Sequence, residues 1–260
     1  RSIDPSSTLP TLGILTQCSI EELNAKMKYA ADDRVFAVYA AVKHGISEEK
    51  IYEYSHIDKW FLDAFAELAK TESNITHISS EDEYLSARAS GFTDADIVFD
   101  GKRQAPSYKA SMKRAPYYLT SVFDGSGDEI KDDAPAGKKV LLIGSGPTFV
   151  GNAAELDWCL VSTAAALRKR GYYVVLLNND PSAVSTGTRY CDKLYFEPVT
   201  ADDASEIADR ERPDYAVTQF CGPQAYKMTE MLEKKGIKIL GPDSGSMNIL
   251  SDKVRFNEEL

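Results

Sequence analysis

The sequence predicts two domains, an all-α helical domain followed by an α/β domain with a Rossmann-like, doubly wound parallel sheet. Three observations support this prediction. In the first hundred positions, apolar residues recur at the three- and four-residue spacing of helices. From residue 138 onward, continuous apolar runs alternate with helical segments, which is typical of a parallel sheet covered on both faces. Between them, residues 125–137 are polar and rich in Gly and Asp, the composition of a linker.

These changes in composition place the domain boundary near residues 125–138. The stretch "RQAPSYKASMKRAPYYLTSVF" is expected to be irregular, because it contains two prolines and clustered aromatic residues. The expected organisation is a tail or linker over 1–18, a helical domain with an irregular C-terminal segment over 19–124, a linker over 125–137, the Rossmann-like domain over 138–251 and the beginning of a further domain over 252–260.

Helix-start signals define the first domain. Ser19 precedes two acidic residues, and Ser80 opens the sequence "SEDE", which matches the S-x-x-E capping box. Within "IDKWFLDAFAELAKTE" a helix is expected to present one apolar face. The residues expected on that buried face are Trp60, Phe61, Ala64 and Leu68.

Composition excludes several functional classes. The formal charge of −10, with neither half of the chain basic, argues against a nucleic-acid binder. Four cysteines without a CxxC pair and only three histidines argue against a zinc site and favour free thiols in a reducing compartment. His44 and His56 lie near helix ends, where capping or surface roles are expected. No apolar run approaches the roughly 20 residues of a membrane span, so no membrane partner and a cytoplasmic location are expected.

A parallel sheet binds ligands at the carboxyl ends of its strands. In this sequence those ends are loops of mostly small and amide residues. They are expected at Gly144–Gly151, Asn178–Thr188, Gln219–Gln224 and Gly241–Ser246.

The stretch "LLIGSGPTFVGNAAELDWC" reads as a strand, a glycine turn and a helix. Gly144 and Gly146 fit the first two glycines of a dinucleotide fingerprint, but Phe149 occupies the third position and the next glycine is Gly151. Two interpretations stay open, a phosphate or nucleotide contact at a helix start and a purely structural turn.

Three acidic residues near this edge are equally ambiguous. Glu155 and Asp157 suit the first turn of a helix without any ligand, because of the helix dipole. Asp180 fits either a ribose hydroxyl contact or a turn before Pro181.

Several stretches taken together resemble the large chain of carbamoyl phosphate synthases. In the α/β half the resemblance rests on the glycine stretch, "NNDPSAVST", "DKLYFEPVT", "YAVTQFCG" and "GIKILGPD…SDKVRFNEEL". It points to the Rossmann-like domain that precedes the second ATP-grasp domain of that family. In the helical half, "DRVFAVYAAVKHGIS", "IDKWFL" and "SARASGFTDADI" resemble the oligomerization domain that comes before it.

The resemblance implies a ligase that makes carbamoyl phosphate from bicarbonate, glutamine-derived ammonia and two ATP, in arginine or pyrimidine biosynthesis. It implies ATP and Mg²⁺ in the parent enzyme, bound by the ATP-grasp domain, and no cofactor, metal ligand or catalytic residue in this piece. The implied partners are further copies through the helical domain, the remainder of the large chain and a glutaminase small subunit.

The resemblance also assigns site residues. Glu155 would be a carboxylate that faces the carbamate tunnel. The residues that would form the loops facing the ATP-grasp centre are Gly144, Gly146, Pro147, Gly151, Asn179, Pro181, Gln219 and Gly222.

The chain departs from the family pattern at three charged positions. Phe149 stands where the family has an arginine, Ser182 where it has a glutamate and Gly187 where it has an aspartate. A divergent paralogue with altered or lost synthetase activity is therefore one possibility. The main expectation is a noncatalytic piece of the large chain, and the alternative is a stand-alone Rossmann-like nucleotide-binding or regulatory module.

Overall fold

The computed structural model describes most of the 260 residues, and the chain divides into two compact units between Gln104 and Ala105. Each unit is described by itself. The residues that the structure describes are 15, 17–31, 33–75, 77–92, 94, 96–112, 114–129, 134, 138–146, 153–187, 189–222 and 225–259. None of the described helices is long and apolar enough to cross a membrane.

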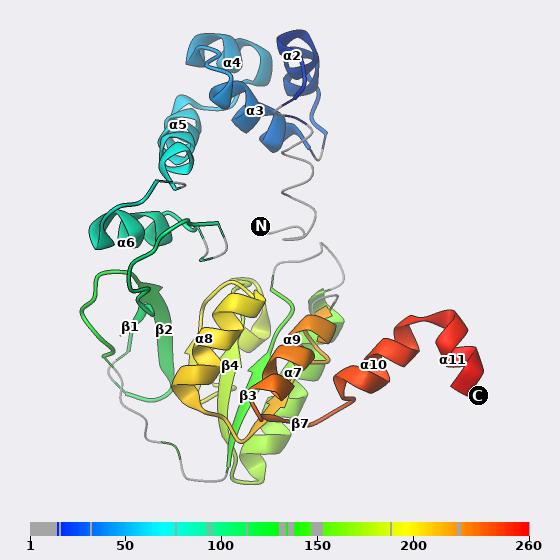
Figure 1. Ribbon diagram of the computed structural model, residues 1–260. Coiled ribbons are helices and arrows are strands. Elements are labelled where there is room, and N and C mark those ends of the chain that lie inside the picture. Colours follow the sequence, from blue (N-terminus) through cyan, green and yellow to red (C-terminus); the bar gives the residue numbers. More distant parts are fainter. Residues whose placement is uncertain are drawn as a thin grey trace. The chain divides into compact units, whose positions relative to one another are not determined.

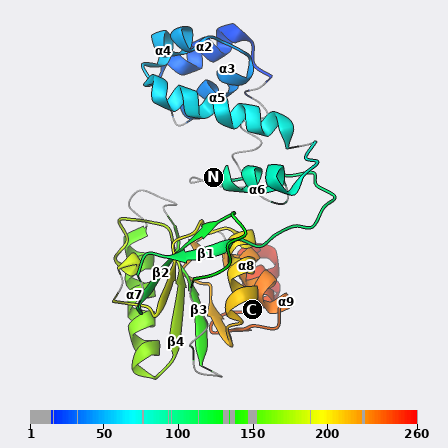
Figure 2. The ribbon, with the colours of Figure 1, turned by 90° about the vertical axis from the view of Figure 1, so that its left-hand side faces the viewer.

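The first unit contains helices α2–α6 in its described part (Figures 1 and 2). Their bounds are α2 Ile20–Lys28, α3 Arg34–Lys43, α4 Glu48–Ser55, α5 Lys59–Asn74 and α6 Glu81–Ala89. Leu23 of α2, Val38 of α3, Ile51 of α4 and Leu62 of α5 are fully buried in one apolar cluster. A second cluster forms around Tyr84 of α6.

The two predicted helix starts are confirmed. The Ser19 hydroxyl accepts the N–H of Glu22 at 3.3 Å, and the Glu22 carboxylate accepts the N–H of Ser19 at 2.8 Å, which completes a capping box. At α6, Ser80 Oγ accepts the N–H of Glu83 at 3.2 Å. Local sequence therefore sets these two boundaries.

The buried face predicted for α5 is wrong. Trp60 is 70% exposed and Phe61 52% exposed, whereas Leu62 is buried and Phe65 packs against the same cluster. The segment is apolar on more than one side, so helical spacing alone allowed two registers, and packing against α3 and α4 selects Leu62. The aromatic pair is left facing outward.

We expect Ser19→Ala to lower the free energy of unfolding by about 1 kcal/mol, because the first turn of α2 loses its side-chain acceptor. Urea unfolding followed by circular dichroism measures the change. Ser47→Ala is the matched control, because Ser47 is the N-cap of α4 but its side chain accepts no capping N–H. Equal losses in the two variants would contradict the assigned role of the capping box.

The second unit is built on a seven-stranded sheet in the order β1-β2-β5-β4-β3-β6-β7. All neighbouring strands are parallel except β1 and β2. The strands are β1 Ser107–Ala110, β2 Tyr117–Val122, β3 Lys139–Ile143, β4 Tyr173–Leu177, β5 Lys193–Tyr195, β6 Tyr215–Val217 and β7 Lys238–Ile239. The helical elements are α7 Ala153–Lys169, η1 Val184–Thr186, α8 Ala201–Glu211, α9 Ala225–Lys234, α10 Ser244–Ser251 and α11 Lys253–Glu259.

Helices cover both faces of this sheet, as the continuous apolar strands predicted. Leu141 and Val175 point into a cluster with α8 and α9, while Val140 and Leu142 point into another with α7. Successive residues of a strand face opposite sides, so one apolar run serves both layers. Helices α10 and α11 continue beyond β7, away from the sheet (Figure 1), and contain no buried residue.

The division of the chain lies earlier than the boundary expected near 125–138. Residues 107–110 and 117–122, expected to belong to an irregular part of the helical domain, form β1 and β2 at the edge of the sheet. The Phe196 N–H donates to Leu119 O at 2.9 Å, and Tyr108 is buried in the cluster under α8. The parallel neighbour of β2 is β5, which lies more than seventy residues later, so nearby sequence does not reveal this pairing.

Candidate functional site

The candidate site lies at the carboxyl edge of the sheet, around the end of β3. Strands β4 and β5 follow one another on one side of β3, and β6 and β7 lie on its other side, so the strand order reverses at β3. This is the topological switch point where open parallel sheets bind ligands. In the described part of the chain, the loops that begin after β3, β4, β5, β6 and β7 lie at that edge, because these strands are parallel.

The glycine turn after β3 has two backbone donors that are already engaged. The Gly144 N–H donates to Leu177 O at 2.8 Å, and the Gly146 N–H donates to Asn178 Oδ1 at 3.0 Å. Gly146 has φ of +61°, a left-handed conformation that favours glycine. The turn therefore depends on its second glycine and is held by the end of β4.

Asn178, which the sequence analysis did not select, joins the first two loops. Its side chain is buried, and its Nδ2 donates to Ser185 Oγ at 2.9 Å while its Oδ1 holds Gly146. A Cβ on Gly144 would lie 2.6 Å from Asn178 Cγ. The first polar residue after a buried strand is the signal that could have identified it.

We expect Gly144→Ala to lower the free energy of unfolding by about 1–3 kcal/mol, because the added methyl overlaps the Asn178 side chain. Chemical denaturation measures the change. Gly245→Ala is the control, since its nearest neighbour is a side-chain oxygen of Asp243 at 3.3 Å. A Gly144→Ala chain as stable as the parent would show that the turn has room for a methyl group.

The loop after β4 turns tightly around Asp180. Its Oδ1 accepts the Ser182 N–H at 2.9 Å and the Ser182 hydroxyl at 2.6 Å, so the bonding supports the turn interpretation of this aspartate. Pro181 is exposed beside it. Asn179 faces the glycine turn, because its Oδ1 would lie 3.0 Å from a Cβ on Gly146. That oxygen is buried and has no hydrogen-bond donor among the described residues.

Of the two acidic residues in α7, Asp157 is structural. Its Oδ2 accepts the Val184 N–H at 2.8 Å and the Ser185 N–H at 3.3 Å, which fixes η1 against α7. Glu155 is exposed in the first turn of α7. Its side chain is therefore accessible from outside the unit. The role expected for Glu155 at a tunnel stays a prediction.

The loop after β6 brings the remaining predicted residues to the same edge. Gln219 is exposed and lies against Gly241, where a Cβ would be 2.5 Å from Gln219 Oε1. Gly222 has φ of +63°, and a Cβ there would lie 4.0 Å from Leu156 Cδ1 of α7. Burial raises the pKa of Cys221 to about 12 and its thiol donates to a carbonyl, so it is not a nucleophile.

The structure thus places Gly144, Gly146 and Asn179 together, and it places Gln219 and Gly222 in the neighbouring loop. Pro147, Gly151 and the departure at Phe149 lie outside the described residues. Among those that are described, no three His, Cys, Asp or Glu side chains are grouped as a metal site requires.

Glu197 is a second residue that sequence analysis left without a role, although it belongs to the quoted stretch "LYFEPVT". Its carboxylate accepts both the N–H and the hydroxyl of Ser121 in β2, the latter at 2.9 Å. Burial raises its pKa to about 7, against the hydrogen bonds from Ser121, which lower it. Two residues later, Val199 Cγ2 would lie 3.3 Å from a Cβ on Gly146.

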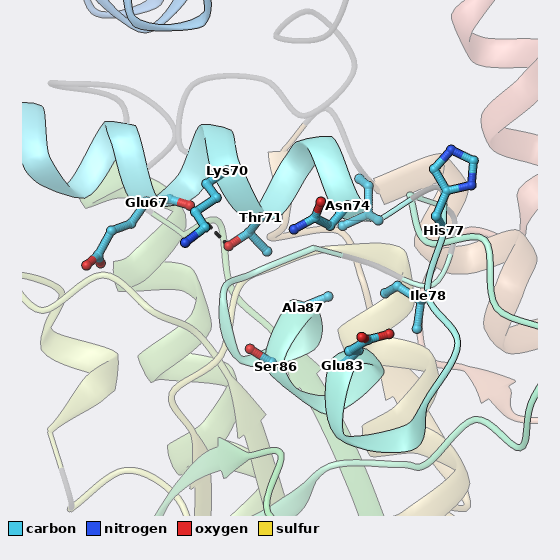
Figure 3. Close-up of a pocket in the computed structure, with 10 residues that line it drawn as sticks. Glu67, Lys70, Thr71, Asn74, His77, Ile78, Glu83, Ser86 and Ala87 are labelled. Atoms are coloured by element: carbon cyan, nitrogen blue, oxygen red, sulfur yellow. Dashed lines mark hydrogen bonds between the residues drawn. The ribbon is translucent and has the colours of Figure 1, made fainter.

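A separate hollow of about 610 Å³ lies in the first unit, between α5 and α6. Figure 3 shows Thr71 of α5 above Ala87 and Ser86 of α6, with the His77 ring directed away from them. Its lining mixes acidic, basic and apolar side chains, and Glu83 already accepts the Ser79 N–H at 2.9 Å. No ligand class follows from that mixture, so the sheet edge remains the candidate site.

Two family models match consecutive parts of the chain. Residues 1–103 match the carbamoyl-phosphate synthetase large chain oligomerisation domain, and residues 136–249 match the carbamoyl phosphate synthase preATP-grasp domain. The two matched ranges fall on either side of the division between the structural units.

Curated relatives agree with these matches. The carbamoyl phosphate synthase large chain of Lachnoclostridium phytofermentans is 34% identical, over 100% of this chain and 26% of its own length. The arginine-specific large chain of Halalkalibacterium halodurans is 33% identical over 99% of this chain and 27% of its own. The arginine-specific, chloroplastic large chain of Oryza sativa is 31% identical over 91% and 23%. The chain therefore spans about a quarter of the length of these relatives.

Proposed function

Because the chain belongs to the carbamoyl phosphate synthase large-chain family, we propose that it serves an ATP-dependent ligase that makes carbamoyl phosphate from bicarbonate and glutamine-derived ammonia. Its α/β unit forms one wall of the centre that phosphorylates carbamate, and its helical unit mediates self-association. The observation that carries the proposal is the match of both family domains, in order, along one chain.

The bonding of the glycine turn supports a wall rather than a phosphate cradle. A cradle offers free backbone N–H groups to the anion. Here the N–H groups of Gly144 and Gly146 donate to the protein itself. The proposal therefore keeps ATP and Mg²⁺ with the remainder of the parent large chain. An independent nucleotide-binding module is the alternative, which the titration below tests.

The exposed aromatic side chains of the first unit support the proposed self-association. Trp60 and Phe61 at the start of α5 form an edge-to-face pair with ring centroids 4.9 Å apart, and Tyr52 of α4 is 46% exposed. Aromatic residues are enriched in the centres of protein interfaces. We propose a second copy of the chain as their partner.

The remaining parts of the proposal concern the parent protein. Its partners are the rest of the large chain and a glutaminase small subunit, and its product serves arginine or pyrimidine synthesis. We propose a cytoplasmic location, while the printed name of the Oryza relative places that protein in the chloroplast. Membranes and nucleic acids have no part in the proposal.

The deciding experiment is isothermal titration of the chain with Mg·ATP and with ADP, with light scattering on the same sample. We expect no heat of binding together with a dimer or larger species. Trp60→Ala with Phe61→Ala is expected to shift the scattering mass toward the monomer. Saturable micromolar binding would overturn the wall assignment, and a monomer at all concentrations would overturn the self-association.

A further inference from the structure

A chain of hydrogen bonds connects α7 to the glycine turn through η1. The Asp157 carboxylate accepts the N–H groups of Val184 at 2.8 Å and Ser185 at 3.3 Å. Ser185 Oγ accepts from Asn178 Nδ2 at 2.9 Å, and Asn178 Oδ1 accepts the Gly146 N–H at 3.0 Å. Both segments that flank residues 147–152 are therefore tied to the same short helix.

These links are shielded from water, which makes them specific. Asn178 and Ser185 are each 1% exposed, and Asp157 is 7% exposed. A buried polar group that loses its partner is not compensated by solvent, so each link resists rearrangement. A carboxamide in its observed orientation supplies the acceptor for Gly146 and the donor for Ser185 at once. The Asn178 side chain fills the space beside Gly144, so that even a methyl group on Gly144 would overlap it.

We propose that Asn178 is a positioning residue, which holds the glycine turn 144–146 in register with η1 and α7 so that the turn presents a fixed surface to the carbamate-phosphorylating centre. The inference rests on the proposed function, because it takes the turn as part of that wall. Asn178 acts through Gly146 and Ser185 and need not touch the substrate.

The test uses the full-length protein that contains this chain, with Asn178→Ala. Amide hydrogen exchange over residues 140–146 reports whether the turn is held. Phosphoryl transfer from carbamoyl phosphate to ADP, giving ATP and carbamate, reports the proposed reaction in reverse. We expect faster exchange in 140–146 and ATP formation slowed by roughly tenfold or more, because small displacements of a positioned group are costly. Bicarbonate-dependent ATP hydrolysis, which does not use carbamoyl phosphate or carbamate, should stay within about twofold in the variant.

Two further variants separate positioning from general destabilisation. Ser185→Ala removes only the link between Asn178 and η1, and it is expected to slow ATP formation by a smaller factor, several-fold. This variant tests the proposal even if Asn178→Ala does not fold. Tyr195→Phe is the control, because it deletes another buried hydrogen bond of the same sheet, to Glu211, without touching the turn. It should lower the melting temperature but leave exchange in 140–146 and the reverse reaction unchanged.

Each outcome has a distinct meaning. Unchanged exchange, or faster exchange without loss of ATP formation, would overturn the positioning role of Asn178. An equal rate loss in Tyr195→Phe would overturn it too, by showing that stability alone governs the rate. If the unsubstituted protein makes no ATP from carbamoyl phosphate, the proposed function fails, and the exchange comparison still decides whether Asn178 holds the turn.

Discussion

Replacing Glu211 with glutamine is expected to lower the free energy of unfolding by about 3–5 kcal/mol, among the largest effects of a single substitution in the second unit. Glu211 ends α8 and is 3% exposed. Its carboxylate accepts Lys139 Nζ at 3.0 Å, Lys193 Nζ at 3.0 Å and the hydroxyl of Tyr195. All three donors are themselves buried.

The reason is that two buried ammonium groups, of Lys139 and Lys193, donate to this one carboxylate. A charge taken out of water is tolerated only when an opposite charge and hydrogen bonds replace its hydration. Burial and the neighbouring carboxylate raise the pKa of Tyr195, which therefore serves as a neutral donor. Glutamine keeps the shape of Glu211 but removes its charge, so the attraction between Glu211 and the two buried ammonium groups is lost.

Guanidinium unfolding of the parent and variant chains measures the difference. Glu230→Gln is the matched control, because Glu230 pairs with Lys234 at 2.8 Å on the exposed face of α9. An exposed pair of this kind contributes about 0.3–0.5 kcal/mol. If Glu211→Gln lowers the free energy of unfolding no more than Glu230→Gln does, the charge of Glu211 is not needed to stabilise the buried lysines.

Sequence patterns predict most of the second unit because its strands are continuous apolar runs. The run at 139–143 has no polar interruption after its first residue and becomes the central strand β3, flanked by β4 and β6. Lys193 is different, since a lysine at the start of a short strand normally signals exposure, yet it is 2% exposed. Its burial depends on Glu211, whose position at the end of α8 only the fold determines.

The first unit shows the limit of periodicity. Capping signals at Ser19 and Ser80 involve residues three positions apart, and both helix starts are confirmed. The reciprocal bond of the capping box forms only at Ser19, because Glu83 accepts the N–H of Ser79 instead. The choice between Trp60 and Leu62 as the buried side of α5 depends on distant helices, and that prediction was wrong. Local rules locate a helix, while packing decides which way it faces.

The candidate site was predicted in part. The carboxyl edge and its glycine turn follow from the strand–turn–helix pattern, which selected Gly144 and Gly146, and their role at a site stays a prediction. Asn178 was not selected, because two adjacent amides after a strand look alike in the sequence, and only the fold shows that Asn178 joins the glycine turn to η1. Glu197 was missed because its partner, Ser121, lies in a strand that the sequence did not reveal.

Glu197→Gln is expected to remove a pH dependence of stability that the parent chain has. The pKa of Glu197 is raised from 4.5 to about 7 in the folded chain, chiefly by burial. Below pH 4.5 the group is protonated in both states and has no effect. Between 4.5 and 7 the unfolded chain ionises first, so folding becomes less favourable as the pH rises, by about 3 kcal/mol in full.

Glutamine cannot ionise, yet it keeps an acceptor for the Ser121 N–H and a donor for its hydroxyl. The groups that face Glu197 from other elements are Ser121 of β2, Tyr108 of β1 and Asp203 of α8. Asp203 adds to the rise, because a second negative charge disfavours ionisation. The variant leaves these groups in place, so the difference between the two proteins isolates Glu197.

Denaturant unfolding at pH 5 and pH 8 checks this expectation. Relative to the parent, Glu197→Gln should gain up to about 3 kcal/mol of unfolding free energy between pH 5 and pH 8. Glu258→Gln, on the exposed helix α11, is the control and should show no such change. If the parent and the variant differ in unfolding free energy by the same amount at both pH values, Glu197 ionises as easily in the folded chain as in water. That result would contradict the raised pKa expected from its burial. A gain would instead mean that the folded chain loses stability as Glu197 ionises, because burial disfavours its charge.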